Sequence, residues 1–392
     1  MNPSLRAIAK LRFAILMTTA VMLAVGSYAG QIIQVGPNRV IKTIAQASQL
    51  AKDGDTVEVD AGSYRADVAV WKQNELHVRA VGGRVRLLAD GAAAEGKAIW
   101  VVRAGQVTLE GFDFEGTKVS DRNGAGIRFE MGRLTVRNCS FVHNEMGLLT
   151  SNNRSSDLII ENSEFSHNGR PDGHNHNLYV GSIASLSVTG SYFHHGVTGH
   201  LLKSRASQNR IMYNRLTDEV GGHASYELEF PDGGIAYVVG NIIGQGRQTE
   251  NSALISFGAE GYKWTHNELY LVNNTLIDGT LFAGRFLRVK SGATVIKGVN
   301  NLLVGSAPLE AGGSGEFVNN FNISVAEFEP DSLQDYRLKA SSKLLARAID
   351  PGQANNQDLK PTREYVHRLR AVVLDATAMH PGAIQRVGPK SP

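Results

Sequence analysis

The chain has 392 residues, with 40 Lys and Arg against 37 Asp and Glu, and a single cysteine. Three of the basic residues and no acidic residue lie within residues 1–29, so the remainder carries 37 charges of each sign. This balance excludes a global field that would attract nucleic acid or a membrane surface, and neither partner is expected. Cys139 alone cannot form an intramolecular disulfide, and its alternating run LTVRNCSF predicts a buried packing residue.

Residues 1–29 have the pattern of a secretory signal peptide. Arg6, Lys10 and Arg12 form a basic start, an apolar stretch covers residues 13–25, and Ser-Tyr-Ala at 27–29 fits a cleavage site. The apolar stretch is short for a membrane anchor, although an uncleaved anchor stays an alternative. We therefore expect an exported, periplasmic or extracellular protein with no membrane span in the mature chain.

Residues 30–95 are expected to form an N-terminal cap and the first coils. A helical stripe (Ile41, Ile44, Ala47, Leu50 and Ala51) is followed by a Gly-Asp turn and an alternating strand. This order of a helix, GDTV and then a Gly and Tyr pair resembles the opening of pectate-lyase-like β-helix proteins. The resemblance implies a fold and no particular chemistry.

A repeat of short β-runs occupies residues 96–325. Its turn residues are Gly111, Asn138, Asn162, Gly190, Asn214, Asn241, Asn274 and Asn301, at steps of 24 to 33 residues. Such a period predicts stacked units, here an all-β, single-stranded, right-handed parallel β-helix. The turn asparagines are expected to stack as a structural ladder.

Residues 326–392 lose the repeat. The segments DYRLKASSKLLARAIDPG and HPGAIQ resemble the tail that closes many exported bacterial β-helix proteins. We predict an irregular closing segment on the last coils, within a single-domain monomer.

Alternation along the strands predicts a column of polar side chains on one face. Successive side chains of a strand point to opposite faces, so the polar residues point outward if the apolar ones point inward. The inward set is Leu178, Val180, Leu202, Tyr226, Leu228 and Phe230. The outward set is Tyr179, Lys203, Glu227, Glu229, Arg128 and Arg288. Because coils lie about 4.8 Å apart, the residues at 179, 203 and 229 should fit within about 10 Å.

Histidines concentrate beside this column, and Arg205 is expected to share its face. Six of the twelve fall between residues 174 and 223: His174, His176, His194, His195, His200 and His223. One interpretation is a catalytic or sugar-binding cluster, and another is an ordinary solvated face. We predict no metal ion; a zinc site in the histidines, or Ca²⁺ at Asp172, Glu227 and Glu229, stays an alternative.

The segment HLLKSRASQNRIMYNRLTD, with VVGNIIGQG one coil later, resembles the active-site coils of the alginate lyase and chondroitinase B family. The shared pattern is the Lys203-Ser204 pair followed by Asn209 and Asn214. The resemblance implies Lys203 as the Brønsted base. The chain departs from the family where YELEFPDGG replaces an arginine-bearing coil and Gly199-His200 replaces acidic calcium ligands. The stretch GHNHNLYVG also resembles the histidine loops of β-helical alginate C5-epimerases.

These observations predict a lyase that cleaves an acidic, uronic-acid-containing polysaccharide by β-elimination. Lys203 or His176 would be the base if its pKa is lowered, Tyr179 the acid, and Arg205 with His200 would neutralise the substrate carboxylate. The expected substrate-binding residues are His174, His223, Glu227, Glu229, Arg128 and Arg288. The alternatives are a C5-epimerase, a glycoside hydrolase that uses Glu227, Glu229 and Asp232, and a non-catalytic carbohydrate-binding or envelope protein.

Overall fold

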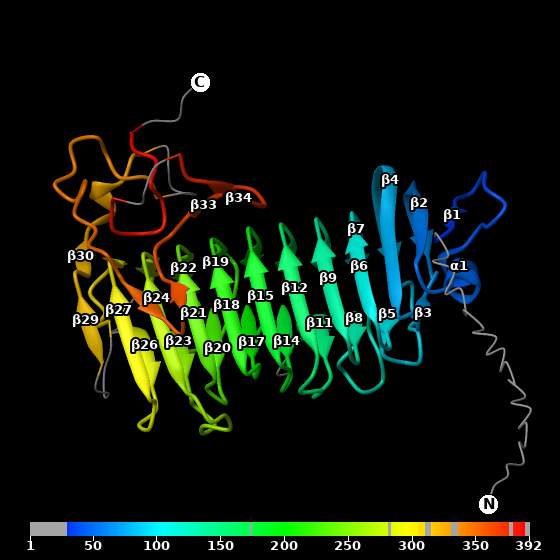
Figure 1. Cartoon of the computed structure of the whole chain (residues 1–392), viewed down its shortest axis with the longest axis horizontal. Helices are drawn as coiled ribbons and strands as arrows, with labels where there is room; N and C mark the ends of the chain where they lie inside the picture. Colours follow the sequence, from blue (N-terminus) through cyan, green and yellow to red (C-terminus); the bar gives the residue numbers. More distant parts are fainter. Residues whose placement is uncertain are drawn as a thin grey trace, which may run out of the picture.

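Each sequence repeat forms one coil of three short parallel strands, and the coils stack along a single axis into a right-handed parallel β-helix (Figure 1). The computed structural model describes residues 30–172, 175–280, 284–309, 315–330, 336–375 and 379–388. The expected signal segment 1–29 lies outside these ranges. Within them, no helix has the length and apolar character needed to cross a membrane. The predicted fold class is confirmed.

One side of the solenoid is a nine-stranded parallel sheet with one strand from each coil. Alternating apolar residues supply its inner side, and the polar residues between them lie on its outer side. Its strands are β3 (Ala69–Trp71), β5 (Ala98–Val102), β8 (Ala125–Phe129), β11 (Met146–Thr150), β14 (Leu178–Val180), β17 (Leu202–Ser204), β20 (Leu228–Phe230), β23 (Ala253–Phe257) and β26 (Arg285–Val289).

Two further rows of strands belong to one 21-stranded sheet, because the long strands β2 (Asp55–Arg65) and β4 (Glu75–Leu88) connect them. The first row contains β6 (Gln106–Glu110), β9 (Arg133–Arg137), β12 (Asp157–Glu161), β15 (Ser185–Thr189), β18 (Gln208–Met212), β21 (Ile235–Val239), β24 (Glu268–Val272), β27 (Val295–Val299) and β29 (Glu316–Val318). The second contains β7 (Phe112–Glu115), β10 (Ser140–Val142), β13 (Glu164–Ser166), β16 (Tyr192–His194), β19 (Arg215–Thr217), β22 (Ile242–Gln245), β25 (Thr275–Asp278), β28 (Leu302–Val304) and β30 (Phe321–Ile323).

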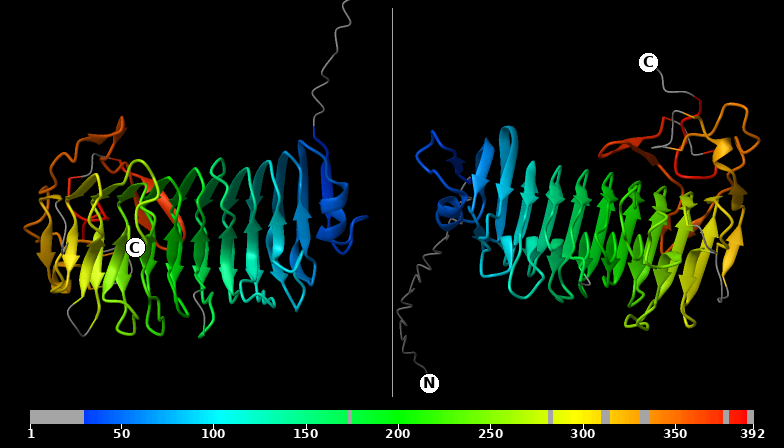
Figure 2. Two further views of the ribbon diagram at one scale, coloured as in Figure 1. Left: turned by 90° about the horizontal axis from the view of Figure 1, so that it is seen from below. Right: turned by 180° about the vertical axis from the view of Figure 1, so that it is seen from behind.

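The N-terminal end is covered by β1 (Ile32–Val35) and the short helix α1 (Ile44–Leu50) (Figure 2). Thr43 caps the helix by accepting a hydrogen bond from the Gln46 backbone N–H. Of the predicted stripe, Ile44, Ala47 and Ala51 are buried and Ile41 packs against the core, but Leu50 is exposed. The stripe prediction was therefore wrong at Leu50.

The C-terminal segment folds back along the 21-stranded sheet (Figures 1 and 2). Asn355 donates to the Tyr237 hydroxyl at 3.1 Å, and the Thr362 backbone N–H donates to the Tyr213 hydroxyl at 3.1 Å. Its elements are the 3-10 helix η1 (Val325–Glu327) and the hairpins β31 (Gln353–Ala354) with β32 (Gln357–Asp358), and β33 (Arg363–Val366) with β34 (Arg370–Val373).

The interior is held by stacked identical side chains. Phe114, Phe141, Phe165 and Phe193 form a continuous stack, with ring centroids 4.5–5.0 Å apart. Such offset ring contacts add to the stabilisation that apolar burial gives each coil. Cys139 is buried in the same interior, as predicted, and burial raises the pKa of its thiol to about 12.

The asparagine ladder exists, but two of its predicted members are wrong. Each ladder residue accepts the backbone N–H of the residue on the preceding coil at 2.9–3.0 Å, and the members are Asn214, Asn241, Asn274, Asn301 and Asn320. Asn138 and Asn162 instead occupy the preceding, left-handed turn position, with φ of 48° and 49°. On their coils Cys139 and Ser163 stand at the ladder position. On these two coils the predicted ladder residue was therefore one position before the true one.

Candidate active site

The predicted outward column exists on the nine-stranded sheet. Tyr179 on β14 pairs in register with Lys203 on β17, and Lys203 pairs with Glu229 on β20. The three side chains therefore lie on consecutive coils of one face. Since parallel strands lie about 4.8 Å apart, this register brings a hydroxyl, an ammonium and a carboxylate into contact range.

Lys203 is held by two carboxylates. Its Nζ lies 3.0 Å from Glu229 Oε2 and 2.9 Å from Glu260 Oε1. Burial of Lys203 opposes its charge, but Glu229 and Glu260 outweigh that effect, so the pKa of Lys203 is raised. The base role expected for Lys203 required a lowered pKa, and the structure has the opposite arrangement.

Arg205 follows two residues later and joins the same group. It donates to the Tyr179 hydroxyl at 2.9 Å, to Asp232 Oδ1 at 2.6 Å and to Glu260 Oε2 at 2.7 Å. Burial opposes its charge, but Glu260, Tyr179 and Asp232 raise its pKa overall. Arg205 is therefore a permanent cation beside the Tyr179 oxygen.

Glu260 bridges the two cations and was not found from the sequence. It lies on the loop that follows β23, 55 residues beyond Arg205, and 46% of its side chain is exposed. Burial favours the neutral form of Glu260, but Lys203 and Arg205 dominate and lower its pKa. The available signal was the longest repeat step, 33 residues between Asn241 and Asn274, which marks an inserted loop on this coil.

His176 and His200 extend the group along the coil axis. Their ring centroids are 4.6 Å apart, and the His176 ring stacks on Tyr179 at 5.4 Å. The His200 backbone N–H donates to His176 Nδ1 at 2.9 Å, and the Tyr226 backbone N–H donates to His200 Nδ1 at 3.4 Å. Each neutral imidazole therefore carries its proton on Nε2.

The Nε2 atom of His200 lies 2.9 Å from Glu229 Oε2, the oxygen that also contacts Lys203. Only 4% of the Glu229 side chain is exposed. Burial favours protonation of this carboxylate, but His200 and Lys203 reverse the effect and lower its pKa. Glu229 is thus an ionised anchor that holds two neighbouring groups in place.

The position of Glu227 contradicts the sequence prediction. It was expected on the outer face, yet it is fully buried, level with Leu201 and Leu254 in the core. Neither carboxylate oxygen has a hydrogen-bond partner among the described residues. Burial raises the pKa of Glu227 well above its ordinary value. Strict alternation fails because the residue precedes β20 and lies at the bend that leads into it.

The other predicted residues lie at different distances from the group. Arg128 shares the column two coils before Tyr179 and contacts Glu130 and Ser151. Arg288 lies two coils beyond Glu229 and donates to the Tyr226 hydroxyl at 3.3 Å.

The remaining predicted residues make no contact with the Lys203 cluster among the described residues. His223 is exposed in the loop between β19 and β20, and its backbone N–H donates to Gly196. Asp172 pairs with Arg170 and Arg122, so Asp172, Glu227 and Glu229 have three different environments and form no single calcium site. His174 lies outside the described residues.

The Lys-Ser…Asn pattern has a structural explanation here. The Ser204 hydroxyl donates to Asn209 Oδ1 at 2.5 Å, and both side chains are fully buried. Asn214 belongs to the ladder. Of this pattern, only Lys203 lies on the outer face, so only Lys203 can contact a substrate.

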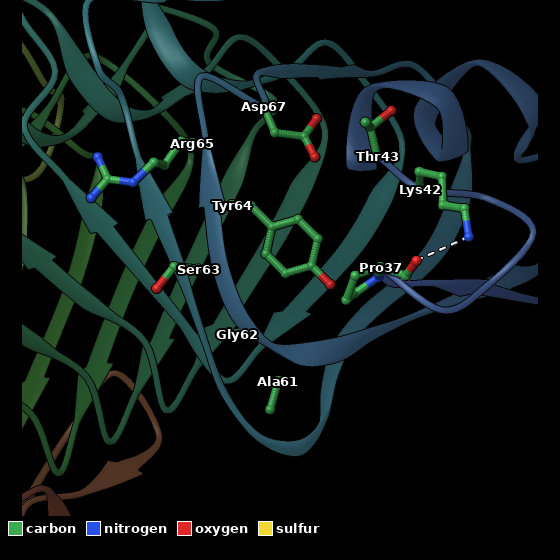
Figure 3. A pocket seen from close by; sticks show the side chains of 9 residues that line it. All are labelled: Pro37, Lys42, Thr43, Ala61, Gly62, Ser63, Tyr64, Arg65 and Asp67. Atoms are coloured by element: carbon green, nitrogen blue, oxygen red, sulfur yellow. Dashed lines mark hydrogen bonds between the residues drawn. The ribbon is translucent and has the colours of Figure 1, made fainter.

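A cavity of about 280 Å³ lies at the N-terminal end of the solenoid (Figure 3), whereas this cluster lies on β14, β17 and β20. Lys42, Tyr64 and Asp67 are among its lining residues. Asp67 accepts hydrogen bonds from the first backbone N–H groups of α1, at 2.7 and 2.8 Å. These contacts cap the helix, so we regard the cavity as part of the N-terminal cap.

No protein-family model matches the chain, and no curated protein matches its sequence. Among solved structures, the crystal structure of pectate lyase Pel9A superposes with a TM-score of 0.64 at 15% sequence identity, over 92% of this chain and 98% of that chain. At 15% sequence identity, this structural similarity establishes the fold alone. The chain therefore has a parallel β-helix fold like that of pectate lyase Pel9A, whereas the resemblance to the alginate lyase and chondroitinase B family stays a prediction.

Proposed function

We propose that the protein is a polysaccharide lyase that cleaves a uronic-acid linkage by β-elimination. The observation that supports this most is the Lys203–Glu260–Arg205 bridge beside the Tyr179 hydroxyl. The pectate lyase scaffold provides independent support of a general kind, because a fold alone assigns no reaction.

The bridge identifies where a substrate carboxylate would bind. The three carboxylates that contact Lys203 and Arg205 differ in exposure: 46% of the Glu260 side chain is exposed, against 4% for Glu229 and 8% for Asp232. Glu260 Oε1 contacts Lys203, and Oε2 contacts Arg205. We infer that the uronate carboxylate displaces Glu260 and takes one contact from each cation, which neutralises the charge that develops at C5.

Tyr179 is the best-placed group for proton transfer. Lys203 is held as a cation, and the hydrogen bonds to Nδ1 of His176 and His200 leave both rings as Nε2–H donors. The Tyr179 oxygen accepts a hydrogen bond from the Arg205 guanidinium, whose charge is placed to stabilise negative charge on that oxygen. The proposed reaction requires the deprotonated form of Tyr179: its oxygen takes the C5 proton, the C4–O4 bond breaks as C4=C5 forms, and the tyrosine returns the proton to O4.

Hydrolysis is less well supported by the charges. An inverting or retaining hydrolase needs a carboxylic acid with a raised pKa beside a second carboxylate. The pKa values of Glu229 and Glu260 are lowered, and Glu227, whose pKa is raised, lies in the core. Elimination therefore fits the available groups better.

The test is the ultraviolet absorbance of the C4–C5 double bond, with polygalacturonate, alginate and glycosaminoglycans, each with and without chelator. Tyr179→Phe should reduce the rate by about 10²- to 10⁴-fold. Tyr237→Phe is the matched control, because its hydroxyl contacts Asn355 on another sheet.

Other products would identify other functions. New reducing ends without absorbance would overturn elimination in favour of hydrolysis. Exchange of the C5 proton with solvent and no cleavage would indicate an epimerase. Binding without turnover on any polymer would indicate a non-catalytic carbohydrate-binding protein.

A further inference from the structure

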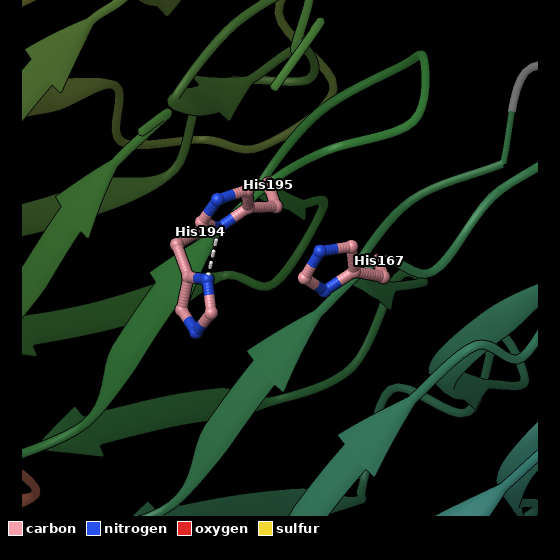
Figure 4. A group of neighbouring side chains, drawn as sticks. All are labelled: His167, His194 and His195. Carbon is pink, nitrogen blue, oxygen red and sulfur yellow. Dashed lines mark hydrogen bonds between the residues drawn. The ribbon is translucent and has the colours of Figure 1, made fainter. Parts of the chain in front are cut away.

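A second histidine cluster lies away from the Lys203 group, where the second row of strands ends. His167 follows β13, and His194 and His195 stand at the corresponding end of β16, one coil later (Figure 4). Their ring nitrogens lie within 4.8 Å of one another, the only such group of His, Cys, Asp or Glu side chains in the described ranges. Nothing in the proposed lyase chemistry uses them.

The backbone forces these rings together. His167 and His195 occupy equivalent left-handed turn positions, with φ of 55° and 44°, and the His167 N–H donates to the His195 carbonyl at 2.9 Å. Their rings stack with centroids 4.6 Å apart. The His194 ring stands nearly perpendicular to both. Three imidazole edges thus converge on one point from two adjacent coils.

One of the rings is already oriented as a metal ligand would be. His194 Nε2 lies 2.8 Å from Glu164 Oε1, and Arg368 contacts the same oxygen. Because the carboxylate accepts the Nε2 proton, the lone pair of His194 is on Nδ1. A carboxylate behind a histidine is the usual outer support of a metal-bound imidazole.

The inner nitrogens contact only one another among the described residues. His194 Nδ1 and His195 Nδ1 are 2.5 Å apart and share one hydrogen bond, in which the lone pair of His194 accepts the proton of His195. His167 Nδ1 is buried without a hydrogen-bond partner among the described residues.

We propose that His167, His194 and His195 bind one first-row divalent transition-metal ion, and we use Zn²⁺ geometry to evaluate the site. Zn–N distances of about 2.0–2.1 Å in tetrahedral geometry place ligand nitrogens about 3.3 Å apart. The present separations bracket that value, so rotation about the side-chain bonds completes the site. Three protein ligands leave a fourth position for water.

A metal-binding titration tests the proposal on the untagged, chelator-treated mature chain. Calorimetry with Zn²⁺ should show one equivalent per chain, and Co²⁺ should give the intense visible absorption of tetrahedral coordination. Zn²⁺ should also raise the melting temperature, because binding to the folded state alone stabilises it.

Variants locate the ion. His167→Gln and His195→Gln should each abolish the Co²⁺ bands, and Glu164→Gln should weaken Zn²⁺ binding about 10- to 100-fold. The matched control is His143→Gln: its ring lies 5.1 Å from His167 at the same turn position one coil earlier, outside the three-nitrogen group. Circular dichroism without metal verifies that each variant is folded.

Two results would overturn the site. The first is the absence of stoichiometric binding by a folded parent chain. The second is Zn²⁺ binding that the folded His167→Gln, His195→Gln double variant retains, since the ion would then be bound elsewhere.

Discussion

Glu260 Oε2 accepts a hydrogen bond from Arg205 at 2.7 Å across two coils of the solenoid, while Oε1 of the same carboxylate contacts Lys203 at 2.9 Å. One half-exposed side chain from a loop thereby bridges the two cations that lie beside the Tyr179 hydroxyl.

Glu260→Gln should strengthen binding of an acidic oligosaccharide. The substrate would no longer compete with an anion whose ion pairs, being half-exposed, contribute about 0.2–1 kcal/mol each. The expected fall in KM or Kd is up to about fivefold. Steady-state kinetics or calorimetry measures it, with Glu250→Gln, an exposed carboxylate on the preceding loop, as the control. A weaker affinity in Glu260→Gln would show that Glu260 helps to hold the substrate.

Arg205→Lys should lose most of the proposed activity although the charge is kept. The guanidinium contacts Tyr179, Asp232 and Glu260 at the same time, and a lysine ammonium cannot reproduce that planar fork. A loss of at least 10²-fold in kcat/KM is expected, by analogy with loss of a charge-stabilising donor. Activity within about threefold of the parent would mean that charge alone suffices and that the bond to Tyr179 has no role.

Glu227→Leu should stabilise the protein, increasingly so as the pH rises. The carboxyl of Glu227 ionises near its ordinary pKa in the unfolded chain but well above it in the folded protein. Its contribution is therefore most favourable below the unfolded pKa and is lost as the pH rises toward the folded pKa, by about 1.4 kcal/mol per pH unit. Leucine fits because Leu201 and Leu254 are its neighbours on adjacent coils.

Denaturant unfolding at pH 4.5 and pH 7.5 measures this effect. Glu229→Gln is the comparison, because the folded pKa of Glu229 is lowered and its contribution is lost only as the pH falls from the ordinary value through that lowered pKa, so its effect should change little between these two pH values. A stability gain of Glu227→Leu that is equal at both pH values would contradict the assignment of a neutral, buried carboxyl.

Asn241→Ala should destabilise the solenoid by about 3 kcal/mol or more. Asn241 Oδ1 accepts from the Asn214 backbone N–H, and its amide donates to the Ile211 carbonyl at 2.7 Å. Each buried polar group left unpaired costs about 1–3 kcal/mol. Asn320→Ala is the control, because this last rung is only half-buried. Equal losses from the two variants would mean that burial does not determine the strength of a rung.

Residue period and alternation were sufficient to predict the coils and the register of Tyr179, Lys203 and Glu229, because a strand fixes both spacing and direction. The same rule failed at Glu227, where the backbone bends before β20. Glu260 was beyond reach because an inserted loop obeys no repeat. The convergence of His167 with His194 and His195 depends on left-handed turn positions at His167 and His195. A histidine in the sequence does not indicate a left-handed backbone.

The Phe stack and the Asn ladder occupy different parts of the axis. Two residues after the Cys139, Ser163 and Ser191 positions come Phe141, Phe165 and Phe193, whereas Asn214 and Asn241 are followed by Leu216 and Ile243. Coils near the N-terminus are thus joined by aromatic contact in addition to amide hydrogen bonds, because Asn144, Asn168 and Asn177 form a second buried run on these coils. The later coils are joined by the amide hydrogen bonds of the Asn ladder.

Cooling weakens apolar association. Because buried asparagine amides link the coils of both halves, backbone amides around β10–β16 are expected to exchange with deuterated solvent on chilling no sooner than those around β22–β28. The solenoid would then stay closed along its whole length.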